Sequence, residues 1–286
     1  MFLGSVRRAP ATIPSMQDAT TPISLRRFDA GTGRAREDRV AREEPLEIRL
    51  SGAPLAVVMR TPGDDRELAL GFLVTERVVE RFEQVESVRH CTQLPGPEAE
   101  DNVLQVVLAP GVEVDLDRLR RNLYASSSCG ICGKATIENA LAEAPPLDDP
   151  SRFPAEFFYP LPARLRARQA AFASTGGLHA AGLFAPDGEL LVVREDIGRH
   201  NAVDKVVGWA LERGRLPLSG HVLMVSGRIS YEIAQKALVA RIPALAAVSA
   251  PSSLAVELAE RSGMALIGFL RGRGLNVYGR EARVWG

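Results

Sequence analysis

Two cysteines set two residues apart are the residues with the clearest chemical potential in this sequence. Cys129 and Cys132 stand in the stretch SSSCGICGKAT, between a serine run and a segment of helical pattern. A thiol just before a helix N-terminus lies at the positive end of the helix dipole, and Lys134 is close in sequence. Both effects favour the thiolate, which is the nucleophilic form of cysteine. The stretch therefore predicts a reactive cysteine on a loop.

Other uses of the cysteine pair stay open on residue types alone. A structural zinc site needs further ligands, and Cys91 and the four histidines are scattered without a second ligand pair. A zinc deaminase would carry an H-x-E motif, which no histidine here supplies. A thioredoxin-like dithiol would follow the first strand of a small domain, which a position near residue 130 does not fit. A structural turn without chemistry is the remaining alternative.

A glycine-opened arginine loop is the second candidate site. The segment FLRGRG, residues 269–274, closes an apolar run with two arginines between glycines. Arginines on such a loop suit bidentate recognition of phosphate, and Phe269 or Tyr278 can flank a flat ring. The stretch 226–228 (SGR), ahead of a predicted helix, is a similar anion-binding candidate. A solvated basic turn is the equal alternative for the arginine loop, and neither stretch is a Walker motif.

The segment REDIGRHNAVD, residues 194–204, is the third candidate. It places six charged or polar side chains within eight residues at a loop-to-helix junction. Such density is costly unless the loop is solvated or lines a polar site, and we favour a site that includes His200. His179, in an apolar segment, fits a core histidine equally well. The candidate cofactor-binding residues are therefore Phe269, Leu270, Arg271, Gly272, Arg273, Gly274, Ser226, Arg228 and His200.

The chain is unusually poor in lysine. Among its 35 lysines and arginines, the only lysines are Lys134, Lys205 and Lys236, and each lies in a segment of interest for other reasons. Lysine and arginine differ in shape and in how readily their charge is tuned. The bias predicts lysine roles that arginine cannot fill, with chance as the alternative.

Composition narrows the class of protein. The 286 residues have room for two domains, and 46% hydrophobic and 24% charged residues are ordinary for a globular protein. Because 35 basic residues balance 35 acidic ones, nucleic acid is not expected as a partner, whereas a local site for a small phosphorylated ligand remains possible. No apolar run suggests a membrane span, and the N-terminus does not read as a secretory signal. A cytoplasmic location is the natural expectation for the close cysteine pair.

The pattern along the first part of the chain predicts a tail and a small α+β domain. Residues 1–40 are polar and aperiodic and are interpreted as a mobile tail. Residues 41–125 are interpreted as the small domain, with a helix after a Pro-Gly turn and with Asp64 and Glu67 as its N-terminal cap. Its predicted strands are two within Leu46–Arg60 around a Ser-Gly turn, then Val85–His90 and Val103–Leu108.

Residues 126–286 predict an α/β domain that carries the cysteine loop at its start. Short apolar strands alternate with helices, which implies a largely parallel sheet covered on both faces. Ligands of such sheets bind at the carboxyl ends of the strands, here the loops 226–228, 249–253 and 271–274. The predicted strands are 171–184, 189–194, 221–225, 244–249 and 264–270, and the predicted helices are 201–213 (capped by Asn201), 229–240 and 253–260.

Several ordered motifs together resemble the FdhD-type family of formate dehydrogenase accessory sulfurtransferases. The resemblance runs from about Glu43 to Tyr278, with one departure at Arg77, where the family pattern usually has glycine. The motifs that carry it are TPGDDRELALGFLVTE (61–76), SSCGICG (127–133), STGGLH (174–179), REDIGRHNAVDK (194–205), SGRISYE (226–232) and FLRGRG (269–274).

The resemblance implies a sulfurtransferase. Such a protein accepts persulfide sulfur from a cysteine desulfurase and passes it to molybdenum bis(molybdopterin guanine dinucleotide), bound as substrate, before that cofactor enters formate dehydrogenase. By position, Cys129 is similar to the persulfide-bearing cysteine and Cys132 to an assisting thiol, and residues 269–274 resemble the cofactor-binding segment.

The resemblance also implies a fold and an assembly. The main domain is expected to be three-layered and similar to the cytidine deaminase fold without its zinc, and a homodimer is expected. A non-catalytic cofactor chaperone and a zinc-binding module are the alternative functions.

Overall fold

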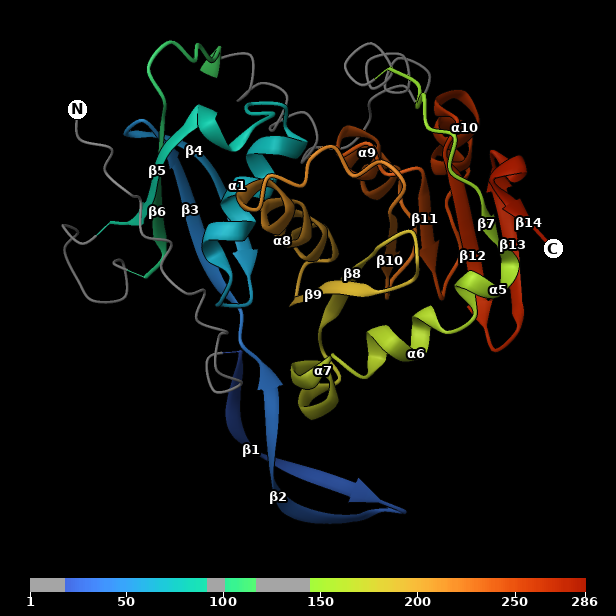
Figure 1. Ribbon diagram of the computed structural model, residues 1–286. Helices are drawn as coiled ribbons and strands as arrows, with labels where there is room; N and C mark the ends of the chain where they lie inside the picture. Colours follow the sequence, from blue (N-terminus) through green and yellow to red (C-terminus); the bar gives the residue numbers. More distant parts are fainter. Residues whose placement is uncertain (1–18, 92–100, 117–144) are drawn as a thin grey trace.

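The computed structural model describes residues 19–91, 101–116 and 145–286 (Figure 1). Two β-sheets pack on opposite sides of a layer of helices. Across Figure 1 from left to right the order is a four-stranded sheet, helix α1, helix α8, and then a six-stranded sheet with its own helices. A mixed α/β architecture is confirmed.

The four-stranded sheet has the order β4-β3-β6-β5. Alternation places Leu46, Ile48 and Leu50 of β3 in the core, where they pack with the apolar face of α1. Ser51 and Gly52 both take positive φ, 48° and 90°, which suits the tight turn between β3 and β4. The predicted strands and helix are confirmed as β3 (Glu44–Leu50), β4 (Ala53–Arg60), α1 (Asp65–Thr75), β5 (Val85–His90) and β6 (Val103–Leu108).

An antiparallel hairpin projects below the body in Figure 1. It consists of β1 (Thr20–Asp29) and β2 (Thr32–Ala41), joined by Ala30 and Gly31 at φ 48° and 85°. The interpretation of residues 1–40 as a tail is therefore wrong from residue 20 on. The hairpin was missed because both of its faces are largely exposed and polar, so no alternation of apolar residues marks the strands.

The six-stranded sheet has the order β13-β12-β11-β10-β8-β9. Only β10, β11 and β12 pair in parallel, and the other three pairings are antiparallel, so the expectation of a largely parallel sheet holds only for its centre. The strands are β8 (His179–Phe184), β9 (Leu190–Asp196), β10 (Val222–Val225), β11 (Ala244–Ala247), β12 (Ala265–Arg271) and β13 (Gly274–Gly279).

Helices cover both faces of this sheet. One buried cluster lies under α8, α9 and α10 and continues to α1 and the small sheet, so a single core joins the two parts. A second cluster lies on the other face, around Phe153 and Phe158. The helices are α5 (Ala155–Phe158), α6 (Leu161–Arg166), α7 (Ala170–Thr175), α8 (Arg199–Glu212), α9 (Tyr231–Val239) and α10 (Ser253–Ser262). The two-domain division and the likeness to cytidine deaminases stay predictions.

Short elements complete the described chain. Strands β7 (Phe153–Pro154) and β14 (Val284–Trp285) pair in parallel, and 3-10 turns span Phe82–Gln84 and Glu281–Arg283. Residues 171–175, predicted as strand, belong to α7. The carboxylate of Glu195 accepts hydrogen bonds from the Ala171 and Phe172 N–H groups at 3.0 and 2.7 Å, and this satisfies the start of that helix.

Helices α1 and α8 approach each other until no side chain fits between them. A Cβ added at Gly71 would lie 1.7 Å from the backbone oxygen of Asp204, and one added at Gly208 would lie 1.9 Å from that of Glu67. Glycine at both positions is therefore a packing requirement. The crossing fixes the small sheet, which packs on α1, relative to the large sheet, which packs on α8.

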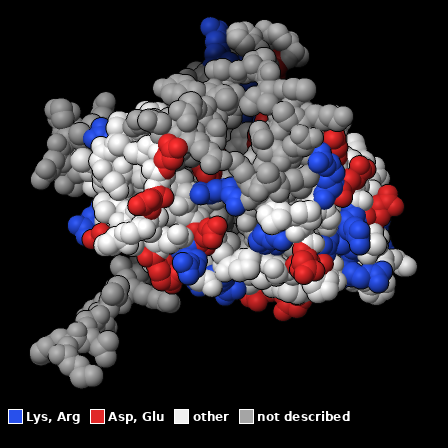
Figure 2. Space-filling view, turned by 90° about the horizontal axis from the view of Figure 1, so that it is seen from above, with Lys and Arg blue, Asp and Glu red and all other residues white. Residues whose placement is uncertain are grey.

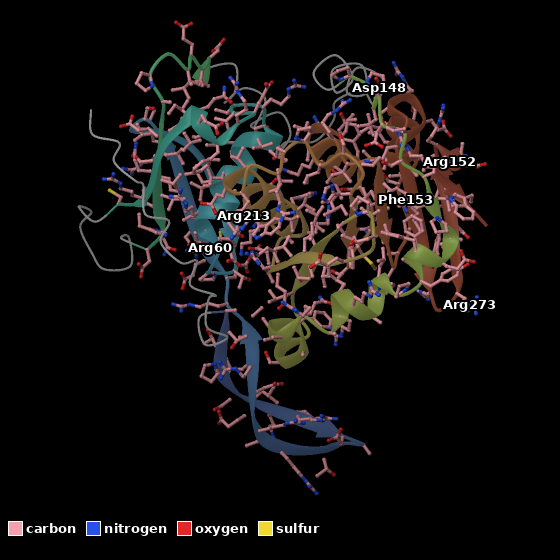
Figure 3. The ribbon with its side chains drawn as sticks, viewed as in Figure 1. Arg60, Asp148, Arg152, Phe153, Arg213 and Arg273 are labelled. Carbon is pink, nitrogen blue, oxygen red and sulfur yellow. The ribbon has the colours of Figure 1, made fainter. Side chains whose placement is uncertain are left out.

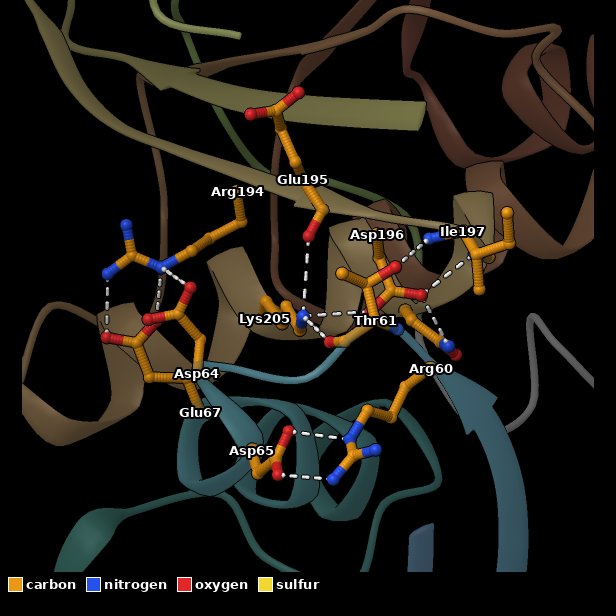
Figure 4. Close-up of polar contacts among 12 residues, drawn as sticks. Arg60, Thr61, Asp64, Asp65, Glu67, Arg194, Glu195, Asp196, Ile197 and Lys205 are labelled. Atoms are coloured by element: carbon orange, nitrogen blue, oxygen red, sulfur yellow. Dashed lines mark hydrogen bonds and ion pairs between the residues drawn. The ribbon is translucent and has the colours of Figure 1, made fainter. Parts of the chain in front are cut away.

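The ammonium groups of Lys205, which is buried, and Lys236, which is mostly buried, stabilise this junction; Figure 4 shows the contacts of Lys205. Lys205 lies 2.8 Å from a carboxylate oxygen of Asp196 and donates to the backbone oxygens of Thr61 at 3.0 Å and Glu195 at 3.3 Å. Lys236 lies 2.9 Å from both carboxylate oxygens of Asp204 and from the Thr75 hydroxyl. Each ammonium thus meets three acceptors at one point, which a planar guanidinium cannot do. These two lysines have a structural role at the junction, and that arginine could not fill it stays a prediction.

Asp64 stands at the predicted N-cap position of α1, but neither Asp64 nor Asn201 caps its helix, because their polar side chains contact the junction instead. Asp64 has φ 57° and makes no capping hydrogen bond. Its carboxylate and that of Glu67 both pair with Arg194 on β9. Asn201 lies inside α8, and its amide donates to Asp196 and to the backbone oxygen of Met59. Charged residues near helix starts therefore link the two sheets.

In the part of the chain that the structure describes, no helix is both long and apolar enough to cross a bilayer. Acidic and basic side chains are interspersed over the described part of the face shown in Figure 2, in keeping with the balanced charge of the sequence.

The α1–α8 crossing gives the first prediction. Gly208→Ala is expected to lower the free energy of unfolding by about 3 kcal/mol or more, because the helices must separate and the lysine contacts must lengthen. Urea unfolding measures this change. Gly177→Ala is the matched control, since its Cβ would meet nothing closer than 3.5 Å. Equal stability of the two variants would contradict the packing account.

Candidate functional site

Three loops meet at the carboxyl edge of the large sheet. Because β10, β11 and β12 are parallel, the segments that follow them lie at the same edge. Backbone hydrogen bonds join them: Ile229 N–H donates to the Ala250 oxygen, and Phe269 N–H donates to the Ser249 oxygen, each at 3.1 Å. The expectation that residues 226–228, 249–253 and 271–274 share one edge is confirmed.

Phe269 stands at this edge in a strained conformation. Its φ of 53° is rare for a residue with a bulky side chain, and its side chain is 45% exposed. An irregularity in the β12–β13 register between Gly268 and Arg271 accompanies it. Strain of this kind persists where the surroundings impose it, and it clusters at functional sites. The structure therefore presents an exposed aromatic ring at the end of β12.

The three exposed arginines at this edge differ in the contacts that their guanidinium groups make. Arg228 and Arg271 are exposed and have no ion-pair partner among the described residues. Arg273 is exposed too, but its guanidinium lies 5.7 Å from the ring centroid of Tyr159. Figure 3 places Arg273 at the lower end of the large sheet. Two arginines are thus unpaired in this part of the structure, and a third rests on an aromatic ring.

Two of the predicted ligand-binding side chains have structural roles. Leu270 is fully buried in the second core cluster, so its side chain packs in the core, and its place in the cofactor-binding segment stays a prediction. The hydroxyl of Ser226 accepts a hydrogen bond from the Ala180 N–H at 2.9 Å and ties the end of β10 to β8. Gly272 and Gly274 keep the tip open, and Gly272 takes φ 57°.

A neutral imidazole marks the other end of the edge. Burial, followed by the nearby charges of Arg199 and Lys236, lowers the pKa of His200 to about 4. Its Nε2 atom is buried without a hydrogen bond within the described ranges, and Glu232 lies 4.0 Å away. Burial and then Arg199 also lower the pKa of His179. In both rings the uncharged form is favoured beside the Arg199 guanidinium.

From the sequence, His179 fits a buried core histidine, and it is not among the candidate site residues. It pairs with Asp196 at the start of β8, and a Cβ on Gly227 would lie 3.3 Å from its Nδ1. The signal that pointed to it was its position after Gly176-Gly177, a loop entering a strand. Since β8 lies three strand spacings from β12, His179 is roughly 14 Å from the Phe269 end of the edge.

The residues of the polar segment 194–204 have two kinds of role: some belong to the buried junction and others to the candidate site. Arg194, Glu195 and Asp196 are engaged in the junction and in the start of α7. Arg199 and His200, at the start of α8, follow the carboxyl end of β9 and lie at that edge. The density of charge that predicted a site therefore reflects mostly the buried junction behind it.

Comparison with known proteins decides the family. A family model described as the FdhD/NarQ family matches residues 41–285. The chain belongs to this family. Curated FdhD relatives carry the name "Sulfur carrier protein FdhD": one from Mycolicibacterium paratuberculosis is 54% identical, covering 89% of this chain and 95% of its own, and one from Streptomyces avermitilis is 53% identical, covering 90% and 93%.

A solved structure has the same fold. The "putative formate dehydrogenase accessory protein" from Desulfotalea psychrophila superposes with a TM-score of 0.72 and 23% identity, covering 93% of this chain and 100% of that chain. At this identity the likeness establishes the architecture alone. The FdhD/NarQ chain thus shares its arrangement of two sheets with a distant relative.

The cysteine motif of this FdhD/NarQ chain, Cys129 and Cys132, lies outside the described residues. The chain re-enters at Pro145, whose backbone oxygen accepts from Arg241, at the amino end of β11. That is the edge of the sheet opposite the arginine loop. Among the described residues, no group of three histidine, cysteine or acidic side chains is placed to hold a metal ion.

The buried imidazole gives the second prediction. An NMR titration is expected to give His200 a pKa near 4. Since the folded-state pKa lies below the unfolded value of about 6.5, the unfolded state binds more protons, and stability falls as pH drops from about 6.5 to 4. In His200→Gln this fall in the urea midpoint should be shallower. A His200 pKa at or above 6.5 would contradict the assignment.

Proposed function

We propose that this protein is a sulfur carrier. It accepts the outer sulfur of a cysteine desulfurase persulfide on Cys129 and passes it to molybdenum bis(molybdopterin guanine dinucleotide), bound as substrate, for use by formate dehydrogenase. Family membership supports the proposal, because the relatives at 54% and 53% identity are named sulfur carrier proteins. The name of the Desulfotalea psychrophila protein supports the link to formate dehydrogenase.

The observation that carries the cofactor half of the proposal is the exposed ring of Phe269 beside the unpaired Arg271. A guanine base has a flat face that stacks on an aromatic ring, and a diphosphate is recognised by guanidinium groups. The backbone bonds between the loops hold these elements in one row along the edge. Such a row suits an elongated ligand with guanine nucleotide ends.

The remaining polar groups of the edge complete the proposed cradle. Arg228 adds a third exposed guanidinium at the end of β10. His200 and His179, whose pKa values are lowered by burial and by Arg199, supply hydrogen-bonding nitrogen atoms next to Arg199. The proposed cradle therefore has exposed guanidinium groups where phosphate binds, and two imidazoles beside Arg199 at its other end.

The sulfur half of the proposal is an exchange at Cys129. The Cys129 thiolate attacks the outer sulfur of the donor persulfide, a new S–S bond forms on Cys129, and the desulfurase cysteine leaves as thiolate. The exchange involves no net oxidation. In the second step an electron pair of the acceptor attacks the outer sulfur, the S–S bond on Cys129 breaks, and Cys129 leaves as thiolate. In this scheme Cys132 is the assisting thiol, with a role to be set by experiment.

Chain length permits one cysteine segment to serve both steps. Twelve residues separate Cys132 from Pro145, where the described chain resumes at the amino edge. Twelve residues span at most about 40 Å when extended. The strands of the large sheet have four to seven residues, so the carboxyl edge is about 13–23 Å away. The reach of the segment is thus no obstacle to transfer.

The third prediction tests the sulfur step. After incubation with a cysteine desulfurase and cysteine, intact-mass spectrometry is expected to show the gain of one sulfur atom, mapped to Cys129. Cys129→Ala should lose this gain completely and should fail to support formate dehydrogenase activity in cells, while its urea unfolding curve stays unchanged.

The outcomes separate the alternatives. Cys91→Ala is the matched control and should gain sulfur like the parent chain. Maturation of formate dehydrogenase by Cys129→Ala would exclude the persulfide and favour a non-catalytic cofactor chaperone. Stoichiometric zinc in the purified protein, released on loss of Cys129, would favour a zinc-binding module.

The fourth prediction tests the nucleotide end, with GDP as the probe. Phe269→Gly is expected to weaken GDP binding about tenfold, because a stacked base is worth about 1–3 kcal/mol. The same change relieves the positive φ of residue 269, so the variant should melt at the same temperature as the parent chain or higher. Isothermal titration and thermal unfolding measure the two effects.

The second part of this test removes the arginines that are proposed to bind phosphate. Arg271→Ala with Arg273→Ala should weaken GDP binding further than guanosine binding, since only GDP carries phosphate. Arg89→Gln, an exposed arginine on β5, is the control. GDP affinity that is unchanged in both Phe269→Gly and the double arginine variant would overturn the assignment of this edge.

A further inference from the structure

Two helices end on arginine where the backbone geometry favours glycine. After α1, Arg77 N–H donates to the Val74 oxygen and Val78 N–H to the Leu73 oxygen. After α9, Arg241 and Ile242 make the same pair of bonds to Leu238 and Ala237. Both are Schellman motifs, and both arginines take φ 62° in the left-handed region.

At the same position, three other helices have glycine instead of arginine. Helices α7, α8 and α10 end on Gly176, Gly214 and Gly263, with φ of 68°, 61° and 75°. A residue with a Cβ is disfavoured in this conformation, so glycine is the usual choice. Arginine stands there only at the ends of α1 and α9 among these five helices. Strain that recurs at two neighbouring helix ends calls for a common cause.

Both arginines line one cavity. It has a volume of about 440 Å³, within the range of small-molecule sites, and lies between the ends of α1 and α9. Its floor is apolar and consists of Val74, Val79, Leu216, Pro217, Val239 and Ala240. Its rim carries Arg77, Arg81 and Arg241, with Glu80 as the one acidic side chain.

The charge of the rim is not balanced within the described residues. Neither Arg77 nor Arg81 has an ion-pair partner there. Arg241 donates to the backbone oxygens of Pro145 and Pro146, which fixes its guanidinium without neutralising it. Three guanidinium groups against one carboxylate therefore surround an apolar floor.

We propose that this cavity is a binding site for a small organic anion with an apolar body, such as an aromatic or aliphatic sulfonate, carboxylate or phosphate ester. The apolar body lies on the floor, and the acidic group is bound by Arg77 and Arg81, with Arg241 as a fixed third charge. The site lies at the amino edge of the large sheet, opposite the candidate nucleotide edge, and does not depend on the sulfur-carrier function.

The test uses the full chain and a pair of fluorescent probes. The probes are 8-anilinonaphthalene-1-sulfonate and its uncharged counterpart N-phenyl-1-naphthylamine. The parent chain should bind the sulfonate at one saturable site, at least tenfold more tightly than the neutral probe. Arg77→Gly, alone and with Arg81→Gln, should weaken sulfonate binding about tenfold or more and leave the neutral probe unaffected.

Folding does not confound this test. Because Arg77→Gly places glycine at a positive φ, its melting temperature should stay level or rise by a few degrees. Arg89→Gln, which does not line the cavity, should bind both probes like the parent chain, as should Phe269→Gly at the opposite edge. Equal affinity for the two probes, unchanged sulfonate binding in the double variant, or a loss in Phe269→Gly equal to that in Arg77→Gly would each overturn the proposal.

Discussion

The close crossing of α1 and α8 is the constraint on which the rest of the structure depends. Where these helices meet, Gly71 and Gly208 leave backbone against backbone, and any side chain there would force them apart. On either side of the crossing, Lys205 forms an ion pair with Asp196, and Lys236 forms one with Asp204. The small sheet, which packs on α1, and the large sheet, which packs on α8, are joined through this contact.

Buried ion pairs of this kind specify geometry more than they add stability, since desolvation offsets much of the attraction. Asp196 is fully buried and accepts hydrogen bonds from Thr61 N–H, Gly198 N–H and the Asn201 amide in addition to its pair with Lys205. These bonds fix the end of β9 and the start of α8. The next residues of the chain, Arg199 and His200, are thereby held at the carboxyl edge, so the junction positions one end of the candidate site.

Elements with strong apolar patterns could be predicted from the sequence. The short strands β10, β11 and β12 and the helices between them were predicted because continuous apolar runs alternate with 3.6-residue periodicity, and their parallel pairing then placed the three loops together. The position of Phe269 and Arg271 at this edge could be predicted in the same way, because both residues lie where β12 ends.

The rest depended on tertiary contacts that no local pattern carries. The hairpin of β1 and β2 has polar residues on both faces. Asp64 and Asn201 resemble helix caps locally, but they bond to partners more than 100 residues away or in the neighbouring sheet. Leu270 sits in a predicted ligand loop, yet its side chain completes the core beneath the sheet. In each case a distant partner, absent from the local sequence, decided the role.

We propose that a guanine nucleotide binds at the carboxyl edge of the large sheet, and a crystal structure of the full chain with GDP tests this most directly. The predicted result is a base stacked on Phe269, with the diphosphate within hydrogen-bonding distance of Arg271 or Arg273. A nucleotide bound instead in the cavity of Arg77 and Arg241, or no nucleotide at this edge at saturating GDP, would contradict it.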